Sequence, residues 1–242
     1  MSDIKISLVA SSIRPHLWDA TERSLTSNKI KWEAIMVGPN KGITPLHYKH
    51  IYSTTKPAQC YEIGFRAAQG ELIHWTADDT TYSVGALDIA YNFWKSRNNE
   101  KLVVAFRTIE DNRDITEWHR FRGKDPFAPR MAPFGLMSNK LFRELGGYDR
   151  RFVCGQSEND VVMRVYELGG KVEICNGAQA LVHHEKSHTS TVFRQGFYHE
   201  DRRVLEGSWI KDGVIQKKRL DAFQPFEDKD ILTVTQSTKG QW

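Results

Sequence analysis

Two adjacent carboxylates, Asp78 and Asp79, directly follow the apolar run at residues 72–76. The run is typical of a buried strand, and ligands in open α/β sheets bind outside the carboxyl ends of the strands. Carboxylate oxygens at such an edge can hold a hard divalent cation, which can in turn bridge a diphosphate. The same pair would also suit a turn in which one carboxylate bonds to the backbone ahead of the next helix. The pair alone leaves metal binding and turn formation both open.

Glu158 is the residue best placed for general-base chemistry. In the run Ser157-Glu158-Asn159-Asp160, an N-cap Ser157 and an N3 Asp160 resemble a capping box with Asp in place of Glu or Gln. Glu158 is not required for capping, although its charge favours the positive end of the helix dipole. A carboxylate that projects from a helix start toward the mouth of the sheet can accept a proton from a hydroxyl. We predict Glu158 as the catalytic base, with Asp160 as the second catalytic candidate.

Two histidines, His183 and His184, stand at the end of the predicted strand 179–183. A neutral imidazole at a strand end can bind a metal or contact a phosphate, because one ring nitrogen is free to act as a ligand. An exposed histidine pair without a ligand is the alternative. The residues themselves do not distinguish the two interpretations.

A polar segment of about 25 residues follows the predicted strand 102–106 and contains three prolines. Segments of this length without secondary structure are usually functional or mobile in compact domains. Its basic residues could receive a phosphate or an acidic acceptor, while a solvated loop is the alternative: Arg120, Arg122, Lys124 and Arg130. We predict that residues 109–133 form a lid over a bound ligand.

The elements that must position these residues alternate between strand and helix. Apolar runs predict strands at 4–10, 33–37, 72–76 and 102–106, and helical spacing predicts helices at 15–25, at 58–68 and after an N-cap at Ser83. This alternation predicts a wound parallel sheet with right-handed crossovers. Further along, the patterns predict a strand at 134–137, a short helix capped by Ser138, a helix at 157–168, and strands at 171–175 and 179–183.

Length and composition support one large α/β domain with an appendage. The chain has 242 residues, of which 40% are hydrophobic and 26% charged, and this excludes disordered and fibrous proteins. We assign residues 1–187 to the domain and 188–242, which are polar and weakly periodic, to a C-terminal extension packed on the domain or on a partner. The net charge of +4 is spread along the chain, so it does not indicate a nucleic-acid binder, although it would suit an anionic substrate.

The sequence also carries an expectation about the compartment. We see no apolar run long enough to span a bilayer and no secretory signal. The three cysteines are widely spaced and match neither a disulfide framework nor a zinc motif. These features predict a soluble, cytoplasmic protein.

Taken in this order, the segments resemble the GT-A fold of family 2 glycosyltransferases over about residues 4–190. The resemblance rests on five segments, each of which matches part of the family pattern: 6–15, 64–73, 134–137, 145–149 and 157–160. It implies a Rossmann-like α/β fold with a mostly parallel central sheet that binds a nucleotide sugar. It further implies a nucleotide-binding turn made of Ala10, Ser11, Ser12 and Arg14, with Asp79 and His183 as metal ligands.

Three positions depart from the family pattern. Ala77 stands where the first Asp of the Asp-x-Asp motif is usual, so Asp79 matches the second Asp and Asp78 becomes a substitute or a ribose contact. The usual Ala-Arg-Asn is replaced by residues 60–62, Cys-Tyr-Glu, which removes a basic contact to the nucleotide. The acidic turn after the second strand is replaced by residues 38–40, Gly-Pro-Asn. The departures bear on the identity of the donor more than on the class of reaction.

The resemblance implies a metal-dependent, inverting glycosyltransferase. It would use Mn²⁺ or Mg²⁺ and a nucleotide-diphosphate sugar, with a UDP-sugar expected, and transfer the sugar to a glycan, a protein, a lipid-linked glycan or a modified nucleic acid. One alternative is a nucleotidyltransferase on a similar fold, which would release pyrophosphate rather than a nucleoside diphosphate. Another is a non-catalytic nucleotide-sugar-binding module, which Ala77 makes conceivable.

Overall fold

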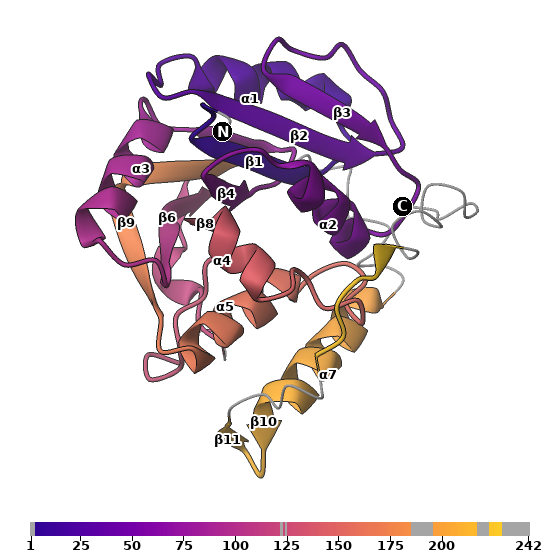
Figure 1. Cartoon of the computed structure of the whole chain (residues 1–242), viewed down its shortest axis with the longest axis vertical. Helices are drawn as coiled ribbons and strands as arrows, with labels where there is room; N and C mark the ends of the chain where they lie inside the picture. Colours follow the sequence, from indigo (N-terminus) through magenta and orange to yellow (C-terminus); the bar gives the residue numbers. More distant parts are fainter. Residues whose placement is uncertain (1–2, 122, 124, 185–195, 217–222, 229–242) are drawn as a thin grey trace.

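The computed structural model describes residues 3–121, 123, 125–184, 196–216 and 223–228. A curled sheet runs through the centre of the molecule, and helices cover it (Figure 1). Within the described residues the sheet contains nine strands, eight of them in the order β3-β2-β1-β4-β8-β6-β9-β5. The ninth, β7, pairs with β6. Their bounds are β1 Ile6–Ser11, β2 Trp32–Gly38, β3 Tyr48–Tyr52, β4 Leu72–Trp75, β5 Thr80–Tyr82, β6 Leu102–Glu110, β7 Arg113–Asp114, β8 Gly135–Ser138 and β9 Lys171–Val182.

The predicted mostly parallel α/β sheet is confirmed. Strands β1, β2, β3 and β4 pair in parallel, and β6 pairs in parallel with β9. The exceptions are β8, which runs antiparallel between β4 and β6, and the short β5, which runs antiparallel to β9. The ends of β1 and β4 that carry the predicted ligand residues therefore lie at the same edge of the sheet.

Helices pack on both faces of the sheet. Their bounds are α1 Trp18–Leu25, α2 Pro57–Ala67, α3 Ala86–Arg97, α4 Asn139–Glu144, α5 Ser157–Glu167 and α7 Phe197–Trp209, with single turns η1 Pro15–Leu17 and η2 Thr116–Trp118. Successive side chains of a strand point to opposite faces, so β1 contributes Val9 to one core and Leu8 to the other. The first core includes residues of α2, α4, α5 and α7, and the second includes residues of α1 and α3.

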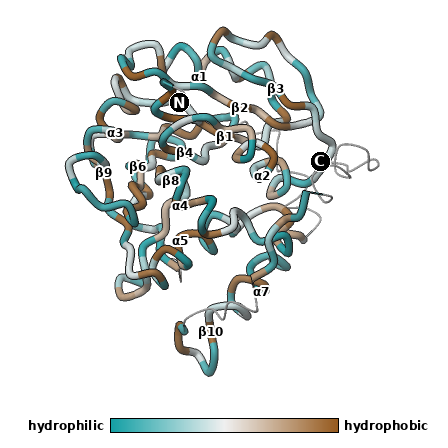
Figure 2. The backbone as a smooth tube through the Cα atoms, viewed as in Figure 1, coloured by the Kyte–Doolittle hydropathy of each residue, from teal (hydrophilic) through white to brown (hydrophobic). Residues whose placement is uncertain are grey.

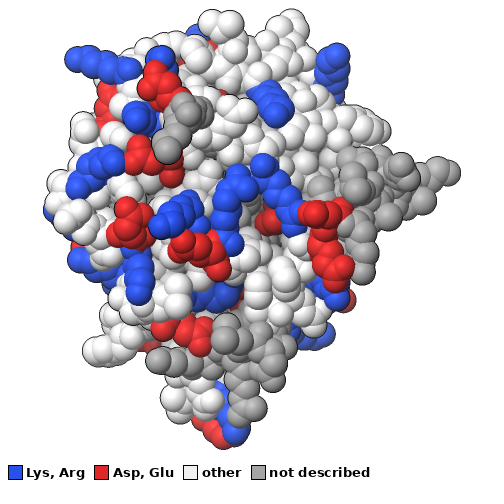
Figure 3. Space-filling model, in the orientation of Figure 1, with Lys and Arg blue, Asp and Glu red and all other residues white. Residues whose placement is uncertain are grey.

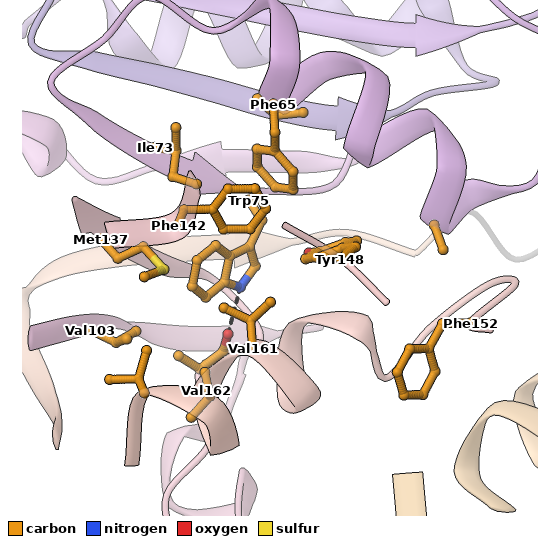
Figure 4. Close-up of a cluster of buried hydrophobic side chains, with 14 of the residues drawn as sticks. Phe65, Ile73, Trp75, Val103, Met137, Phe142, Tyr148, Phe152, Val161 and Val162 are labelled. Atoms are coloured by element: carbon orange, nitrogen blue, oxygen red, sulfur yellow. Dashed lines mark hydrogen bonds between the residues drawn. The ribbon is translucent and has the colours of Figure 1, made fainter. Parts of the chain in front are cut away.

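Trp75 joins β4 to the core under α5. Its indole nitrogen donates a hydrogen bond of 2.7 Å to the carbonyl oxygen of Ala132. Figure 4 shows Val161 and Val162 beside this indole, with Phe142 and Tyr148 nearby. Both valines are fully buried. This packing fixes the position of the helix that carries Glu158.

Several elements differ from the sequence prediction. Ser83 does not cap α3, because Gly85 is the N-cap in a left-handed conformation and the Ser83 hydroxyl accepts a bond from the Gln179 amide instead. Strand β6 continues to Glu110, so part of the expected 109–133 loop is a hairpin with β7. The two strands expected at 171–183 form one strand, β9, with a bulge in its pairing. The predicted cap of α4 is confirmed, since the Ser138 hydroxyl accepts from the Leu141 amide.

The described part of the C-terminal extension packs against the domain. Leu205 and Trp209 of α7, together with Phe226, belong to the same core as α5. The strands β10 Ile210–Lys211 and β11 Val214–Ile215 pair as a hairpin that lies at the far end of α7 (Figure 1). Along α7 hydrophobic and hydrophilic positions alternate (Figure 2). The boundary at 187/188 stays a prediction.

The surface carries charges of both signs. On the face in view, Lys and Arg lie interspersed with Asp and Glu (Figure 3). This agrees with a modest net charge that is spread along the chain. Among the helices described, none combines the length and apolar character that crossing a membrane requires.

Candidate functional site

Asp78 holds the turn that follows β1. One of its carboxylate oxygens accepts hydrogen bonds from the Ser12 hydroxyl at 3.0 Å and from the backbone amides of Ile13 and Arg14, each at 2.9 Å. Its other oxygen accepts from the Arg14 side chain, with Nε at 2.9 Å. Asp78 is buried, so these charge-assisted bonds fix the turn firmly. The turn interpretation holds for Asp78, but the backbone it binds lies after β1 rather than ahead of α3.

Asp79 lies where the same turn meets the end of β9. Its Oδ2 is 2.8 Å from Nη1 of Arg14 and 3.6 Å from Nδ1 of His184. Burial raises the pKa of Asp79, the charge of Arg14 opposes the rise, and the charge of Asp78 adds to it. His184 also bonds Glu110 through Nε2. The bond with Glu110 and the charge of Asp79 outweigh burial and raise the pKa of His184.

The two histidines meet Asp79 in different ways. His183, the predicted metal ligand, donates its backbone amide to the Asp79 carbonyl oxygen at 3.2 Å, and its side chain is exposed. His184 brings its ring toward the Asp79 carboxylate. The imidazole next to the Asp79 carboxylate is therefore that of His184. The sequence could not distinguish His184 from His183, because the two are adjacent.

The other predicted nucleotide-binding residues lie on the same edge. Ala10 is a member of β1 and is fully buried, so neither its side chain nor its backbone is exposed to a ligand in this structure. Ser11 ends β1, and its buried hydroxyl lies beside the Cys60 thiol. Ser12 follows, between Asp78 and the Trp18 indole nitrogen, which donates to its hydroxyl at 2.8 Å. Of the four predicted residues, Ser11 and Arg14 are partly exposed at this edge, and Ala10 and Ser12 are buried.

At this edge the side chains that could serve as ligands of a divalent cation are Asp79 and His184. Within the described ranges, no three His, Cys, Asp or Glu side chains gather as a ligand set. Mg²⁺ in proteins commonly uses one or two carboxylates together with substrate phosphates and waters. Asp79 and His184 offer one carboxylate and one imidazole, and the carboxylates of Asp78, Asp79 and Glu110 outnumber the cation Arg14. The donor set and the excess of carboxylates therefore suit a cation that a diphosphate would complete.

Glu158 is the second residue of α5, and the capping box predicted around it is wrong. Gln156 is the N-cap, in a left-handed conformation with φ 65°, and no side chain caps the helix. Ser157 is then already helical, one position too late to cap, and its buried hydroxyl has no hydrogen-bond partner in the described structure. Burial raises the pKa of Glu158 to about 7; backbone amides at the helix start oppose the rise and Asp201 adds to it. A carboxyl group with this pKa can take up a proton near neutral pH.

Asp160 is more deeply buried than Glu158. Directly and through Arg164, it connects α5 to α7 and to the turn after α4. It is fully buried; its Oδ2 accepts from Nε of Arg164 and its Oδ1 from Nε1 of Trp209, both at 2.9 Å. Arg164 also donates to the carbonyl oxygens of Leu145 and Gly147. Both carboxylate oxygens of Asp160 thus hold neighbouring elements, and this arrangement suits positioning better than proton transfer.

A cavity of about 300 Å³ opens beside Glu158. The start of α5 forms one wall, the segment 118–133 forms another, and α7 forms the third through Tyr198, Arg202, Leu205 and Glu206. Asp160 is not among the lining residues. Of the predicted basic loop residues, Arg120 lines the cavity, Arg130 pairs with Glu117, and Arg122 and Lys124 lie outside the described residues.

Asp201 connects α7 to the start of α5. It is buried, and its carboxylate accepts hydrogen bonds from three successive backbone amides, those of Val153, Cys154 and Gly155, at 2.7–2.9 Å. The sequence patterns did not predict that α7 lies beside Glu158. A signal was present, because Asp201, Leu205 and Trp209 are spaced four apart and so share one face of a helix.

The pKa of Tyr61 depends on both groups of carboxylates, the aspartate pair and Glu158. It replaces the basic residue of the family pattern, and its hydroxyl donates to the carbonyl oxygen of Thr76 at the end of β4. Burial raises its pKa, and the charges of Glu158, Asp78 and Asp79 each raise it further. The charges of the aspartate pair and of Glu158 therefore all disfavour ionisation of this one phenol.

Solved structures share this architecture. No protein-family model matches the chain, and no curated protein matches its sequence. Staphylococcus aureus TarS 1–349 in complex with UDP-GlcNAc aligns with a TM-score of 0.64 at 13% identity, over 84% of this chain and 66% of that one. S. aureus TarS gives 0.62 at 12%, over 87% and 40%. GalNAc-T7 with UDP, GalNAc and Mn²⁺ gives 0.62 at 11%, over 87% and 49%.

These similarities establish the fold. The neighbours are GT-A glycosyltransferases, so the predicted GT-A architecture is confirmed. The chain spans 40% of the length of TarS and 49% of GalNAc-T7. Membership of family 2 in particular stays a prediction.

Proposed function

We propose that the protein is a glycosyltransferase that moves a sugar from a UDP-sugar to an acceptor hydroxyl. The observation that carries the proposal is Glu158, a carboxyl group with a pKa of about 7 on the wall of a cavity, in a fold whose neighbours were solved with UDP-GlcNAc or UDP. The aspartate pair that follows β4 would add a second, charged subsite beside the turn after β1.

The donor would bind at the edge formed by β1 and β4. The turn from Ala10 to Arg14 would contact the nucleotide, with Asp78 holding the turn or contacting the ribose. Asp79 and His184 would hold a divalent cation, Mn²⁺ or Mg²⁺, with His183 as the alternative imidazole. When bound, this cation neutralises charge on the diphosphate as it leaves. One neighbour was solved with Mn²⁺.

The acceptor would react at Glu158. Its carboxylate accepts the proton of the acceptor hydroxyl as that oxygen bonds to the anomeric carbon of the donor. The bond from the anomeric carbon to the diphosphate oxygen breaks, and the nucleoside diphosphate leaves with the electron pair. Attack from the face opposite the leaving group inverts the anomeric configuration. Asp160, Arg164 and Trp209 would hold α5 so that Glu158 stays at the cavity.

A screen of nucleotide sugars with Mn²⁺ or Mg²⁺ tests the proposal. Each reaction is scored for the sugar-bearing product and for the phosphate species released. Release of nucleoside diphosphate with transfer supports a glycosyltransferase. Release of sugar 1-phosphate from the nucleotide sugar, or of pyrophosphate in a parallel reaction with a nucleoside triphosphate and a sugar 1-phosphate, would instead identify a nucleotidyltransferase, and the proposal would be wrong.

One residue favours a different class of function. Ala77 removes a carboxylate from the usual metal motif, and this supports the alternative of a module that binds a nucleotide sugar without turning it over. Such a module would bind UDP-sugar with unchanged affinity in wild type and Glu158→Gln and would form no product with any acceptor. Product formation that depends on Glu158 would exclude it.

A further inference from the structure

The cavity beside Glu158 is lined by hydrogen-bond donors, by hydrogen-bond acceptors and by aromatic rings. Gln156 and Asn159 line it from α5, and the Asn159 amide donates to the Gln156 side-chain oxygen at 2.8 Å. Trp118 lines it from η2, and Tyr198 lines it from α7. Trp118 is 44% exposed, an unusual position for so large an apolar ring. An apolar ring face next to hydrogen-bonding groups suits a ligand with both characters.

Among the described residues that line the cavity, the positive and negative charges are equal in number. The described lining contains two guanidinium groups, Arg120 and Arg202, and two carboxyl groups, Glu158 and Glu206. Arg202 is paired with Glu206 at 2.8 Å, and Arg120 is 3.3 Å from Glu117, just outside the lining. An anionic acceptor would have to disrupt these pairs and approach two carboxyl groups. A hydroxyl group both donates and accepts hydrogen bonds, so it can satisfy guanidinium, amide and carboxylate partners alike.

The size of the cavity limits what it can hold. A volume of about 300 Å³ is at the small end of ligand pockets, which run from roughly 300 to 1,000 Å³. A cavity of this size suits one or two sugar rings of a larger glycan. A pyranose has a C–H face that can pack on an indole and a rim of hydroxyls that can bond to polar walls.

The wall from α7 is held rigidly against α5. Asp201 binds three backbone amides before α5, and Trp209 binds Asp160 within it. A wall fixed at both ends loses little conformational entropy when a ligand binds, so it can contribute to specificity.

We infer that this cavity binds the acceptor and that the acceptor is a neutral carbohydrate. One sugar ring packs on Trp118, and its hydroxyls bond to the polar residues of α5 and α7, with the reacting hydroxyl at Glu158. The inference rests on the proposed function, because it assigns the substrate class of the same site. It makes Trp118 and the α7 residue Arg202 determinants of acceptor specificity.

The test measures acceptor binding separately from donor binding and from turnover. Binding of neutral methyl glycosides and disaccharides to the full chain is followed by saturation-transfer NMR in the presence of UDP. Matched uronic acids, sugar phosphates and a Ser/Thr peptide are measured in the same way. UDP binding is measured by calorimetry in parallel. We expect at least one neutral disaccharide to bind, with weaker binding or none for the charged compounds and the peptide.

The variants locate the binding site. Trp118→Ala should weaken disaccharide binding by roughly tenfold or more, as loss of a central aromatic contact usually does, while UDP binding stays unchanged. Phe127→Ala is the matched control, because Phe127 lies on the same segment, is 94% exposed and does not line the cavity. Arg202→Ala should weaken disaccharide binding without affecting UDP.

The outcomes separate the inference from the proposed function. A preference for sugar phosphates, uronic acids or the peptide, equal disaccharide affinity in Trp118→Ala and wild type, or no disaccharide binding at all would overturn the inference. Any of these results with normal UDP binding leaves the proposed transferase standing. Disaccharide binding that depends on Trp118 in a chain that does not bind UDP would support the carbohydrate site and contradict the transferase.

Discussion

The two regions proposed to bind the donor and the acceptor are built in different ways. The edge that carries Asp78 and Asp79 is formed by short segments directly after β1, β4 and β9, and its charged groups are already paired with one another. The cavity beside Glu158 is formed by α5, the segment 118–133 and α7, which lie far apart in the sequence. The first region is a set of paired charges held in fixed positions. The second is a pocket whose three walls come from separate segments, so each wall can vary independently. The donor half should therefore depend on electrostatics, and the acceptor half on shape and hydrogen bonding.

The largest expected effect distinguishes catalysis from helix stabilisation at Glu158. Glu158→Gln should lower turnover by roughly 100-fold or more, because the amide cannot accept the proton, and should leave UDP binding nearly unchanged. If the residue only favoured the helix dipole, the change would cost about 0.3–1 kcal/mol of stability and little activity. Turnover and melting temperature of the purified variant check this. Near-normal turnover would end the assignment.

Asp160→Asn is the control for Glu158→Gln, since it changes a carboxylate in the same helix. It leaves Arg164 and Trp209 with an amide in place of their buried charged partner. Breaking a buried ion pair by removing one partner costs about 3–5 kcal/mol. The loss of stability should thus exceed the loss of activity per folded molecule. The reverse pattern would make Asp160 the base.

The pH dependence of turnover should report the same carboxyl group. Burial raises the pKa of Glu158 to about 7, and only the ionised form can act as a base. Turnover should fall about tenfold per pH unit below 7 and level off above it. The sign for stability is opposite, because a raised carboxyl pKa stabilises the fold at low pH and that contribution is lost as pH rises through 7. The acid limb should be absent from the residual activity of Glu158→Gln; its persistence there would assign the titration to another group.

Asp79 tests whether the donor half depends on a cation. Asp79→Asn should reduce UDP affinity in Mn²⁺ by about tenfold, because a carboxylate ligand is lost, and should change it little in EDTA. Asp78→Asn is the contrasting variant, since Asp78 holds the turn after β1 and its loss should lower UDP affinity in both conditions. Calorimetric titration with UDP gives both values. Equal Mn²⁺ dependence in Asp79→Asn and wild type would remove Asp79 as a ligand.

Asp201 tests whether α7 belongs to the acceptor half. Asp201→Asn weakens the bonds to the amides of residues 153–155 and should cost about 1–3 kcal/mol of stability. The charge of Asp201 raises the pKa of Glu158, so the acid limb of the pH profile should move to lower pH. Glu200→Gln, a change at the exposed neighbour on α7, should do neither. An unmoved profile in Asp201→Asn would leave Asp201 with a structural role alone.

The sequence predicted the sheet better than it predicted the cavity. Buried parallel strands are continuous apolar runs, so β1, β2, β4 and β6 could be recognised locally. Strand β3 was missed because it is partly exposed and polar, and β5 because it has only three residues.

The two proposed regions of the site also differ in how well the sequence predicts them. Asp78, Asp79 and Glu158 could be selected as candidates because each follows or begins an element that the sequence reveals. The start of α5 was misread, because no local pattern indicates that Gln156 adopts a left-handed conformation. The role of α7 was missed, because the spacing of its buried residues reveals a helix face but not which element that face covers.

The smallest expected effect concerns the segment 109–133, which the sequence predicts to be a lid. The structure gives part of it internal order, since β7 pairs with β6, Arg120 bridges to Gly123 and Arg130, and Glu117 pairs with both arginines. Residues of this segment also line the cavity, so a bound ligand would contact it directly.

Limited trypsin digestion after Arg120 and Arg130 should therefore slow several-fold when UDP-sugar, Mn²⁺ and a neutral disaccharide are all present, and less with UDP and Mn²⁺ alone. Protection by UDP alone, equal to that of the full mixture, would place the segment over the donor half instead. Equal cleavage with and without ligands would mean that the segment is a fixed wall, and the closing motion would be excluded.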